Sequence, residues 1–273
     1  MDTQPTTTST PAPKPIMFSS SSWATFKSCP HRLWLREQKW SMPNQRPDCR
    51  LASLAVPGLV IDKLFELWLY RREFENYEWL TNNFSLVWRM MLEQKRPKWV
   101  SDHEHQCVRR QTQSSVQILY RLLHQHDLLN DQMGVQTAFH ESVGDGVSIA
   151  GAIDLWCIRK DNTFVIVDFK NFQSGTRRSV DQLHFYAMAL KRIVGREPDE
   201  AGYVCFHPGY SGYRKTVLRQ CDRNKLLARL ARAVQARRED KHPMRWNPVS
   251  CGRYCEQRFA CEEFRKRTGV RPT

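Results

Sequence analysis

Two aspartates and a lysine lie at the ends of two neighbouring predicted strands. Gly151 and Asp154 are followed by Asp168 and Lys170, the two aspartates being fourteen residues apart. Because successive strand residues point to opposite faces, Asp168 and Lys170 share a face. The run 163–170 is apolar on both faces up to Asp168, as in a central buried strand, and a charge there is costly without a partner. A divalent cation is one candidate for that partner, and a salt bridge to Lys170 is the simpler one.

A shared metal ion would allow these residues to catalyse a reaction. Adjacent antiparallel strands lie ~4.8 Å apart, so Asp154 and Asp168 reach one cation if the register puts them on the same side. Mg²⁺ is held by one or two carboxylates together with waters and phosphate oxygens. It would activate a water and offset the charge on a scissile phosphate, with the ammonium of Lys170 beside it.

A helix predicted over 180–193 follows this strand directly. It places Gln182 and Tyr186 four residues apart, and therefore on the same face. The first turn of this helix is expected to overhang the point where the carboxylates meet. Packing in the core is the alternative role for both side chains.

These residues together carry a resemblance to a known family. The motifs are Gly151-x-x-Asp154, Asp168-x-Lys170 and Gln182-x-x-x-Tyr186. In order and spacing they resemble the RecB-like branch of the PD-(D/E)XK nuclease superfamily, over about residues 22–261. The resemblance implies a restriction-endonuclease-like core and a Mg²⁺- or Mn²⁺-dependent deoxyribonuclease.

The resemblance also implies a role for each matching residue. Asp154, Asp168 and the backbone carbonyl of Phe169 would hold the metal. Lys170 would position or polarise the attacking water. The two helix residues, glutamine and tyrosine, would line a DNA groove beside the metal.

The chain departs from the family pattern at one position. In that family an early helix carries a glycine followed four residues later by a metal-binding histidine, whereas Gly58 is followed here by Asp62. A carboxylate suits Mg²⁺ or Mn²⁺ as well as imidazole does, so Asp62 is a candidate ligand, with Glu66 one turn on as a spare. A solvated helix aspartate is the alternative. Glu141 matches an acidic position that the family often shows at the start of this sheet.

The cysteines suggest a second metal site. Cys251, Cys255 and Cys261 form a close trio, and Cys29 precedes a proline far upstream. RecB-like nucleases of the AddB type and the related CRISPR-associated nucleases carry a [4Fe–4S] cluster in a similar arrangement, although their first gap is more often two residues than three. A structural Zn²⁺ is the alternative, because four cysteines also bind zinc. The remaining cysteines are expected to be ordinary core or surface residues: Cys49, Cys107, Cys157, Cys205 and Cys221.

The composition limits the class of binding partner and the cellular compartment of the protein. The 273 residues include 42 lysines and arginines against 28 acids, a net charge of +14. This charge favours a polyanionic partner, DNA before an anionic membrane. No apolar run approaches the ~20 residues of a spanning helix and no signal peptide is recognisable. With nine cysteines, we expect an intracellular (cytoplasmic) protein with reduced thiols.

The periodicity of apolar residues predicts an α/β (α+β) fold. A tail of low apolar content over 1–21 precedes one domain over 22–273. A helical part, 22–130, includes a helix capped by Ser22 and another from Asp102 to His126. A small mixed sheet flanked by helices, 131–220, has strands at 135–143, 148–158, 163–170, 202–207 and 213–218. A helix and the cysteine-rich end fill 221–273.

Basic residues add to the predicted DNA interface. Arg177 and Arg178 follow the strand of Asp168 and could contact phosphate. The stretch Arg229–Arg238 is expected to be a solvated helix face. No motif reads base edges, which predicts cleavage with little sequence specificity. With the activity that the family resemblance implies, the prediction is an exonuclease for single-stranded DNA or DNA ends. The alternative is an inactive nuclease-like subunit that binds DNA; protein partners in DNA processing are left open.

Overall fold

The computed structural model describes residues 14–38, 49–171, 180–248, 251, 255, 257 and 260–269, without the side chains of 49–54. Arg177 and Arg178 lie outside this range. In chain order the elements are β1 (Ile16–Ser19), α1 (Ser20–Ser28), α2 (Pro30–Glu37), α3 (Cys49–Arg71), α4 (Tyr77–Lys95), α5 (Asp102–Gln125), β2 (Met133–Gly144), β3 (Val147–Ile158), β4 (Phe164–Lys170), α6 (Asp181–Ile193), β5 (Glu200–His207), β6 (Tyr210–Thr216), α7 (Gln220–Arg238) and α8 (Glu262–Thr268).

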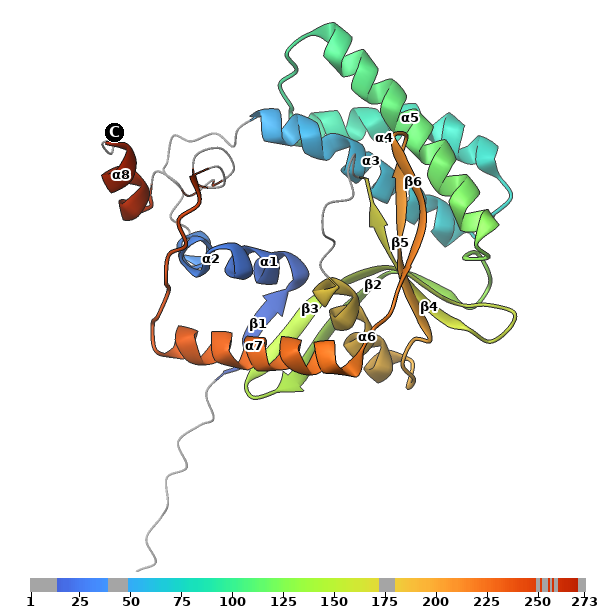
Figure 1. Ribbon diagram of the computed structural model, residues 1–273. Helices are drawn as coiled ribbons and strands as arrows, with labels where there is room; N and C mark the ends of the chain where they lie inside the picture. Colours follow the sequence, from blue (N-terminus) through green and yellow to red (C-terminus); the bar gives the residue numbers. More distant parts are fainter. Residues whose placement is uncertain are drawn as a thin grey trace, which may run out of the picture.

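The described strands form one mixed sheet flanked by helices, as predicted (Figure 1). The order is β1-β3-β4-β5-β6, and β2 also pairs with β3. The pairs β1–β3 and β4–β5 are parallel, and the other pairs are antiparallel. The turn between β2 and β3 has positive φ angles at Gly144, Asp145 and Gly146, which suits glycine and aspartate.

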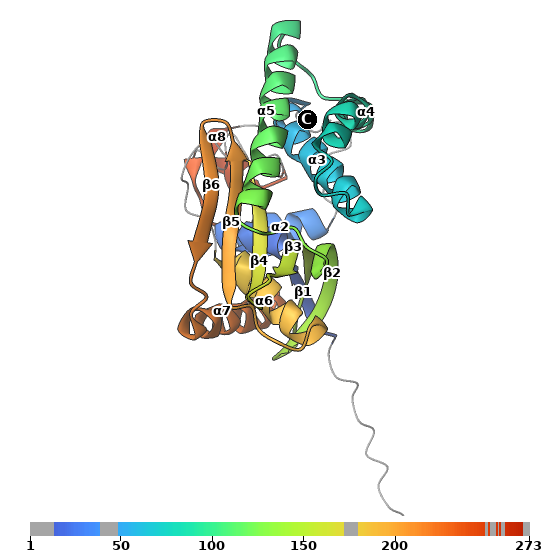
Figure 2. The ribbon, with the colours of Figure 1, turned by 90° about the vertical axis from the view of Figure 1, so that its right-hand side faces the viewer.

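Each face of the sheet has its own hydrophobic core. Along β4, Val165 and Val167 pack against α3, α4 and α5, whereas Phe164 and Ile166 pack with α1, α6 and α7. This alternation is the period of two that a strand buried on both faces requires. In Figure 1 the helices α3–α5 lie on one side of the strands and α1, α6 and α7 on the other. Figure 2, turned by 90°, shows α3–α5 at the top of the molecule and α6 and α7 at the bottom. None of the helices in the described ranges is long and apolar enough to cross a membrane.

Close to Asp154, the side chains of β2 and β3 switch the core toward which they point. Val135 and Leu155, which pair with each other, belong to the core under α3–α5, whereas Phe139 and Ile153 belong to the opposite core. Residues 153 and 155 would share a face in a regular strand. The pairing of Gln136 with Asp154 is missing from the ladder, and Gln136 has a φ of 44°. A local irregularity of this kind redirects a side chain, and here that side chain is Asp154.

The ordered chain begins earlier than the sequence predicts. Ile16–Ser19, inside the predicted tail of 1–21, forms β1 and pairs in parallel with β3. The reason is local, because the apolar run Ile16-Met17-Phe18 interrupts the polar tail and Phe18 is completely buried. Ser19 caps α1, and Ser22, predicted as the cap, returns the hydrogen bond from the third helical position in a capping box.

The basic helix α7 also differs from its prediction as a solvated face. Arg229 donates to Asp181 at the start of α6, and Arg237 pairs with Glu37 at the end of α2. Two of its cations therefore join elements that are far apart in the sequence. The other predicted boundaries agree with the structure to within a few residues, including α5 and the sheet strands.

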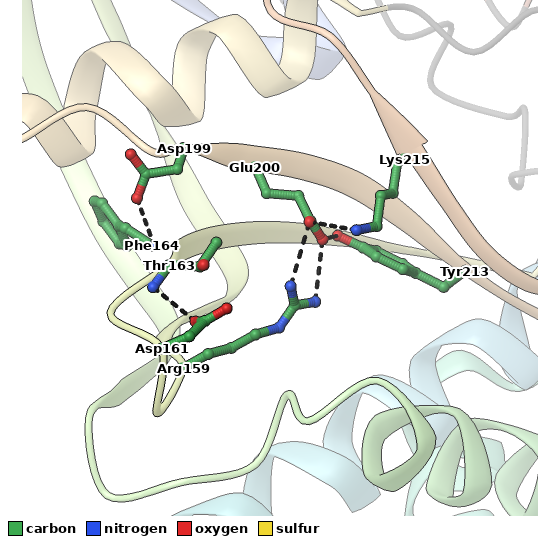
Figure 3. A network of polar contacts seen from close by, with 8 residues as sticks. All are labelled: Arg159, Asp161, Thr163, Phe164, Asp199, Glu200, Tyr213 and Lys215. Carbon is green, nitrogen blue, oxygen red and sulfur yellow. Dashed lines mark hydrogen bonds and ion pairs between the residues drawn. The ribbon is translucent and has the colours of Figure 1, made fainter.

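At the start of β5 a carboxylate is surrounded by donors (Figure 3). Glu200 accepts hydrogen bonds from Arg159 at 3.0 and 3.2 Å, and from Tyr213 and Lys215, each at 2.6 Å. Although burial acts in the opposite direction, these hydrogen bonds lower the pKa of Glu200. Asp199 beside it accepts from the backbone N–H of Phe164 at 2.8 Å, which ties the start of β4 to the start of β5.

Candidate active site

The strands β3 and β4 separate where the two predicted aspartates face each other. Leu155 pairs with Val167, so the next pair along this register is Asp154 with Asp168. The ladder stops before that pair, and Asp154 Oδ2 accepts the backbone N–H of Phe169 at 2.8 Å instead. A side chain thus replaces a ladder bond and keeps the backbone donor satisfied. The register brings both carboxylates to one point, on the same side, as the sequence predicts.

Four side chains, including that of Asp168, form a closed ring of polar contacts. Lys170 pairs with Asp168 and donates to Gln182 Oε1 at 3.3 Å. The Gln182 amide donates to the Tyr186 hydroxyl at 2.7 Å, and that hydroxyl donates to Asp168 Oδ1 at 3.4 Å. Strand alternation and helical spacing together produce this ring, since residues 168 and 170 share one face of β4 and residues 182 and 186 one face of α6.

The ring lies under the surface on one side and opens on the other. Asp168 is completely buried and Tyr186 is 3% exposed, whereas the Lys170 side chain is 20% exposed. The hydroxyl of Tyr186 therefore contacts Asp168 in the interior, and its side chain is too buried to line a groove. Gln182 is only partly buried and lies between Tyr186 and the lysine.

The two strand aspartates lie in an environment that resists their ionisation. Burial raises the pKa of Asp154 to about 8, and the charge of Asp168 adds to this. Burial also raises the pKa of Asp168, while Lys170 and the Tyr186 hydroxyl act in the opposite direction. Removing a carboxylate from water disfavours its charged form, and a second carboxylate nearby does the same.

The helix α3 brings a third carboxylate to this point. Asp62 is exposed at the surface, but loss of solvent around its carboxyl group, caused by the neighbouring protein, raises its pKa to about 6. Lys170 lowers this pKa, whereas Asp168 and Glu66 raise it, so Asp62 lies within electrostatic reach of the ring. Glu66 itself pairs with Lys63 at 3.0 Å.

Glu141, which the sequence assigns no definite role, lies away from the two strand aspartates. It pairs with Ile149 on β3, five residues before Asp154. At ~3.3 Å per strand residue this separates Glu141 from the carboxylates by about 16 Å. Its side chain borders a different groove, with Lys191 and Arg192 of α6.

The donor set at this site fits a hard divalent cation. Three carboxylates, those of Asp62, Asp154 and Asp168, face a single ammonium, and all three have raised pKa values. A cation with oxygen ligands would offset this excess of negative charge. In the described part of the chain no group of three or more His, Cys, Asp or Glu side chains is placed so that it could hold a metal ion.

The four predicted cysteines line one cavity, and all four are far from the strand aspartates in the sequence. Cys29, between α1 and α2, lines a cavity of about 40 Å³ together with Cys251, Cys255 and Cys261. Burial raises the pKa of Cys255, Arg32 lowers it, and the two neighbouring cysteines raise it. Four thiols with a cationic side chain beside them suit a soft metal centre. Cys157 and Cys205 are buried in the sheet as ordinary core residues, in agreement with the prediction.

Two features of the site were not predicted. The amide of Phe169 holds Asp154, and this depends on where the ladder ends, which the sequence does not mark. Asp181, the first residue of α6, accepts hydrogen bonds from Trp23, Lys27 and Arg229. The sequence shows an acidic residue at the start of a helix, but it does not show the three partners, two of which lie more than 150 residues upstream.

Comparison with known proteins identifies the family. No curated protein matches the chain. Among solved structures it is similar to the crystal structure of SSO0001, with 15% identity, a TM-score of 0.34, and coverage of 59% of this chain and 77% of that one, a likeness too weak to carry an argument. The family model described as PD-(D/E)XK nuclease superfamily matches residues 17–262, which include the whole carboxylate site and all four cysteines. The chain therefore belongs to the PD-(D/E)XK nuclease superfamily.

Proposed function

We propose that this member of the superfamily is a Mg²⁺- or Mn²⁺-dependent deoxyribonuclease of the RecB-like branch. It hydrolyses phosphodiester bonds as an exonuclease on single-stranded DNA or DNA ends, with little sequence specificity. One observation carries the proposal: Asp154 and Asp168 meet where β3 and β4 separate, and Lys170 of the same strand face is held beside them. The net charge of +14 supports a polyanionic substrate.

Each residue of the site has a separate role in the proposed reaction. Asp154, Asp168 and the carbonyl of Phe169 would hold the cation, with Asp62 completing the set from α3. When bound, the cation supplies an activated water and offsets charge on the phosphate. Lys170 would place its ammonium beside the attacked phosphate, where charge develops. Gln182 and Tyr186 fix the position of Lys170 and Asp168 through the ring of contacts.

A digestion of end-labelled DNA tests this proposal. The purified protein should degrade single-stranded DNA in Mg²⁺ or Mn²⁺ and lose this activity in EDTA. Asp168→Asn should abolish cleavage, whereas Asp222→Asn, an exposed carboxylate at the start of α7, should leave it unchanged. Equal activity of wild type and Asp168→Asn would rule out the assigned site. Labels at the 5′ and 3′ ends distinguish stepwise removal of nucleotides from internal cleavage.

A DNA-binding subunit without cleavage is the second candidate. The observation that favours it is Asp62, which stands where the resembling nucleases carry a metal-binding histidine. On this reading the protein binds DNA with salt-dependent affinity but leaves the labelled strand intact in either metal. The raised pKa of Asp62 does not distinguish the two candidates, because a carboxylate waiting for a cation and a redundant one are desolvated alike.

For the cysteine cavity we propose a structural [4Fe–4S] cluster, with Zn²⁺ as the alternative. The convergence of Cys29 with the three C-terminal cysteines supports a four-thiolate site. It would close a loop of more than 200 residues, which removes much unfolded-state entropy. Protein purified without oxygen should be brown, and Cys255→Ser should lose the visible absorbance. Colourless protein that contains stoichiometric zinc would select the alternative.

A further inference from the structure

The first residue of α6 is held by three donors from distant parts of the chain. Asp181 Oδ2 accepts the indole N–H of Trp23 at 2.9 Å and the ammonium of Lys27 at 2.6 Å. Its other oxygen, Oδ1, accepts from Arg229 at 3.0 Å. The two donors on α1 are 158 and 154 residues away, and the donor on α7 is 48 residues away. One carboxylate thus joins α1, α6 and α7.

The acceptor of this contact is largely removed from solvent, whereas the side chains of Lys27 and Arg229 are 31% and 42% exposed. The Asp181 side chain is 14% exposed, and Trp23 is 3% exposed. The guanidinium of Arg229 also lies 5.9 Å from the centre of the Trp23 ring, so the donors support one another. Charge-assisted hydrogen bonds of this kind are stronger than neutral ones, and burial protects them from screening.

The helix α6 has no side-chain cap that could fix its start in another way. Its N-cap is Val180, which makes no side-chain cap hydrogen bond. A negative charge in the first helical turn is favourable, but by itself it does not orient the helix. Core packing of Leu183 holds this turn against the sheet, and the three donors add a polar anchor at its first residue. The next residue is Gln182, which contacts Lys170, and Tyr186 follows one turn later.

We propose that Asp181 is a positioning residue for catalysis: it fixes the first turn of α6 so that Gln182 and Tyr186 hold Lys170 and Asp168 in place. The proposal rests on the proposed nuclease function. A displacement of ~1 Å at a catalytic group costs as much as 100-fold in rate, so the anchor matters although it touches no substrate. The helix α1 that supplies two donors leads directly into Cys29, which connects the cysteine cavity to the same anchor.

Hydrogen exchange tests the anchor without any need for activity. In Asp181→Ala, amides in the first turns of α6, in a peptide over 183–190, should exchange about tenfold faster. Asp222→Asn serves as the matched control, since it removes an exposed first-turn carboxylate from α7. Lys27→Met should also accelerate exchange in α6, and Lys27→Arg, which keeps donors in reach, should restore most of the protection. Unchanged protection in Asp181→Ala and Lys27→Met would overturn the proposal.

Kinetics then separate positioning from a general loss of stability. With metal and DNA, Asp181→Ala should lower kcat about tenfold while the KM for DNA stays within about twofold. Because Asp181 acts through Gln182 and Tyr186, adding Asp181→Ala to the double variant Gln182→Ala/Tyr186→Phe should cause no further loss of rate. Multiplied losses in the triple variant would show an independent structural effect and contradict the proposal. If the wild type itself cleaves no DNA, the nuclease proposal fails, and the exchange experiment still decides whether Asp181 anchors α6.

Discussion

The carboxylates at the two ends of β4 and β5 have opposite electrostatic environments. Glu200 pairs in register with Val165 near the start of β4, whereas Asp168 lies near its end. Glu200 is surrounded by Arg159, Tyr213 and Lys215, and these donors lower its pKa. Asp168 shares its end of the sheet with Asp154 and one lysine, and the pKa values of both aspartates are raised.

The difference separates carboxylates that stabilise the fold from carboxylates that cost stability. A buried carboxylate with several donors is satisfied within the protein, as at Glu200. Buried carboxylates that face each other stay unfavourable until a cation arrives from outside. Such a cluster is expected at a functional site and not in a structural network. The predictions below test this contrast, from the largest expected effect to the smallest.

Asp154→Asn should abolish function and stabilise the metal-free protein. Cleavage should fall about 1,000-fold, equivalent to ~4 kcal/mol of transition-state stabilisation. The asparagine oxygen still accepts the N–H of Phe169, but the repulsion from Asp168 is gone. Thermal unfolding in EDTA at pH 8 should therefore show a melting temperature higher by about 3 °C.

The pH dependence of this stabilisation has a definite sign. Because the folded-state pKa of Asp154 is raised to about 8 from 3.8, the wild type loses stability as the pH rises from about 4 to about 8. The asparagine variant lacks this loss, so the two proteins should converge near pH 4. A variant less stable than the wild type at pH 8 in EDTA would contradict the view that this carboxylate costs stability.

Asp62 tests whether the cluster extends to α3. Asp62→Ala should lower cleavage about tenfold to 100-fold, because one of the three carboxylates around Lys170 is lost. Asp62→His should retain more activity than the alanine variant, with a larger share in Mn²⁺ than in Mg²⁺, since imidazole is the softer ligand. Glu66→Gln, one turn further along α3, is the control. Full activity of Asp62→Ala would remove this residue from the metal site.

Much of the carboxylate site was predictable because it depends on short-range geometry. Strand alternation puts Asp168 and Lys170 on one face, and helical spacing does the same for Gln182 and Tyr186. The register of a hairpin then brings Asp154 to Asp168. The strand and helix boundaries follow from the same periodicities, which explains why the mixed sheet was predicted correctly.

Contacts between distant segments were the part that periodicity could not predict. β1 is a short apolar run at the end of a polar tail, and only its pairing with β3 makes Phe18 a core residue. Arg229 was expected in solvent, because a basic helix face has the same pattern whether or not an aspartate lies opposite. The cysteine grouping came from resemblance and not from spacing alone, since Cys29 lies more than 200 residues before the trio.

Glu200→Gln should destabilise the protein without a direct effect on the carboxylate site. The loss should be about 2 kcal/mol at neutral pH, because Arg159, itself only 13% exposed, loses its charged partner. Since the folded-state pKa of Glu200 lies below the ordinary value of 4.5, its stabilisation is present above that value and lost as the pH falls through the folded-state pKa. Chemical unfolding at pH 7 and pH 3 measures both quantities. Equal destabilisation at the two pH values would argue against an ionic contribution.

Glu197→Gln should cost less than Glu200→Gln, although the pKa of Glu197 is lowered to about 2. Its carboxylate accepts two hydrogen bonds from Arg223 at 2.8 Å and one from Lys191 at 2.9 Å, but the side chain is 38% exposed. Solvent screens an exposed pair, so the expected loss is about 1 kcal/mol at pH 7, and it should decrease in 0.5 M salt. The loss should also vanish as the pH falls from about 4.5 to 2. Because Glu200 is only 14% exposed, salt should change the effect of its replacement less. Equal salt sensitivity of the two variants would mean that burial is not what separates the strong pair from the weak one.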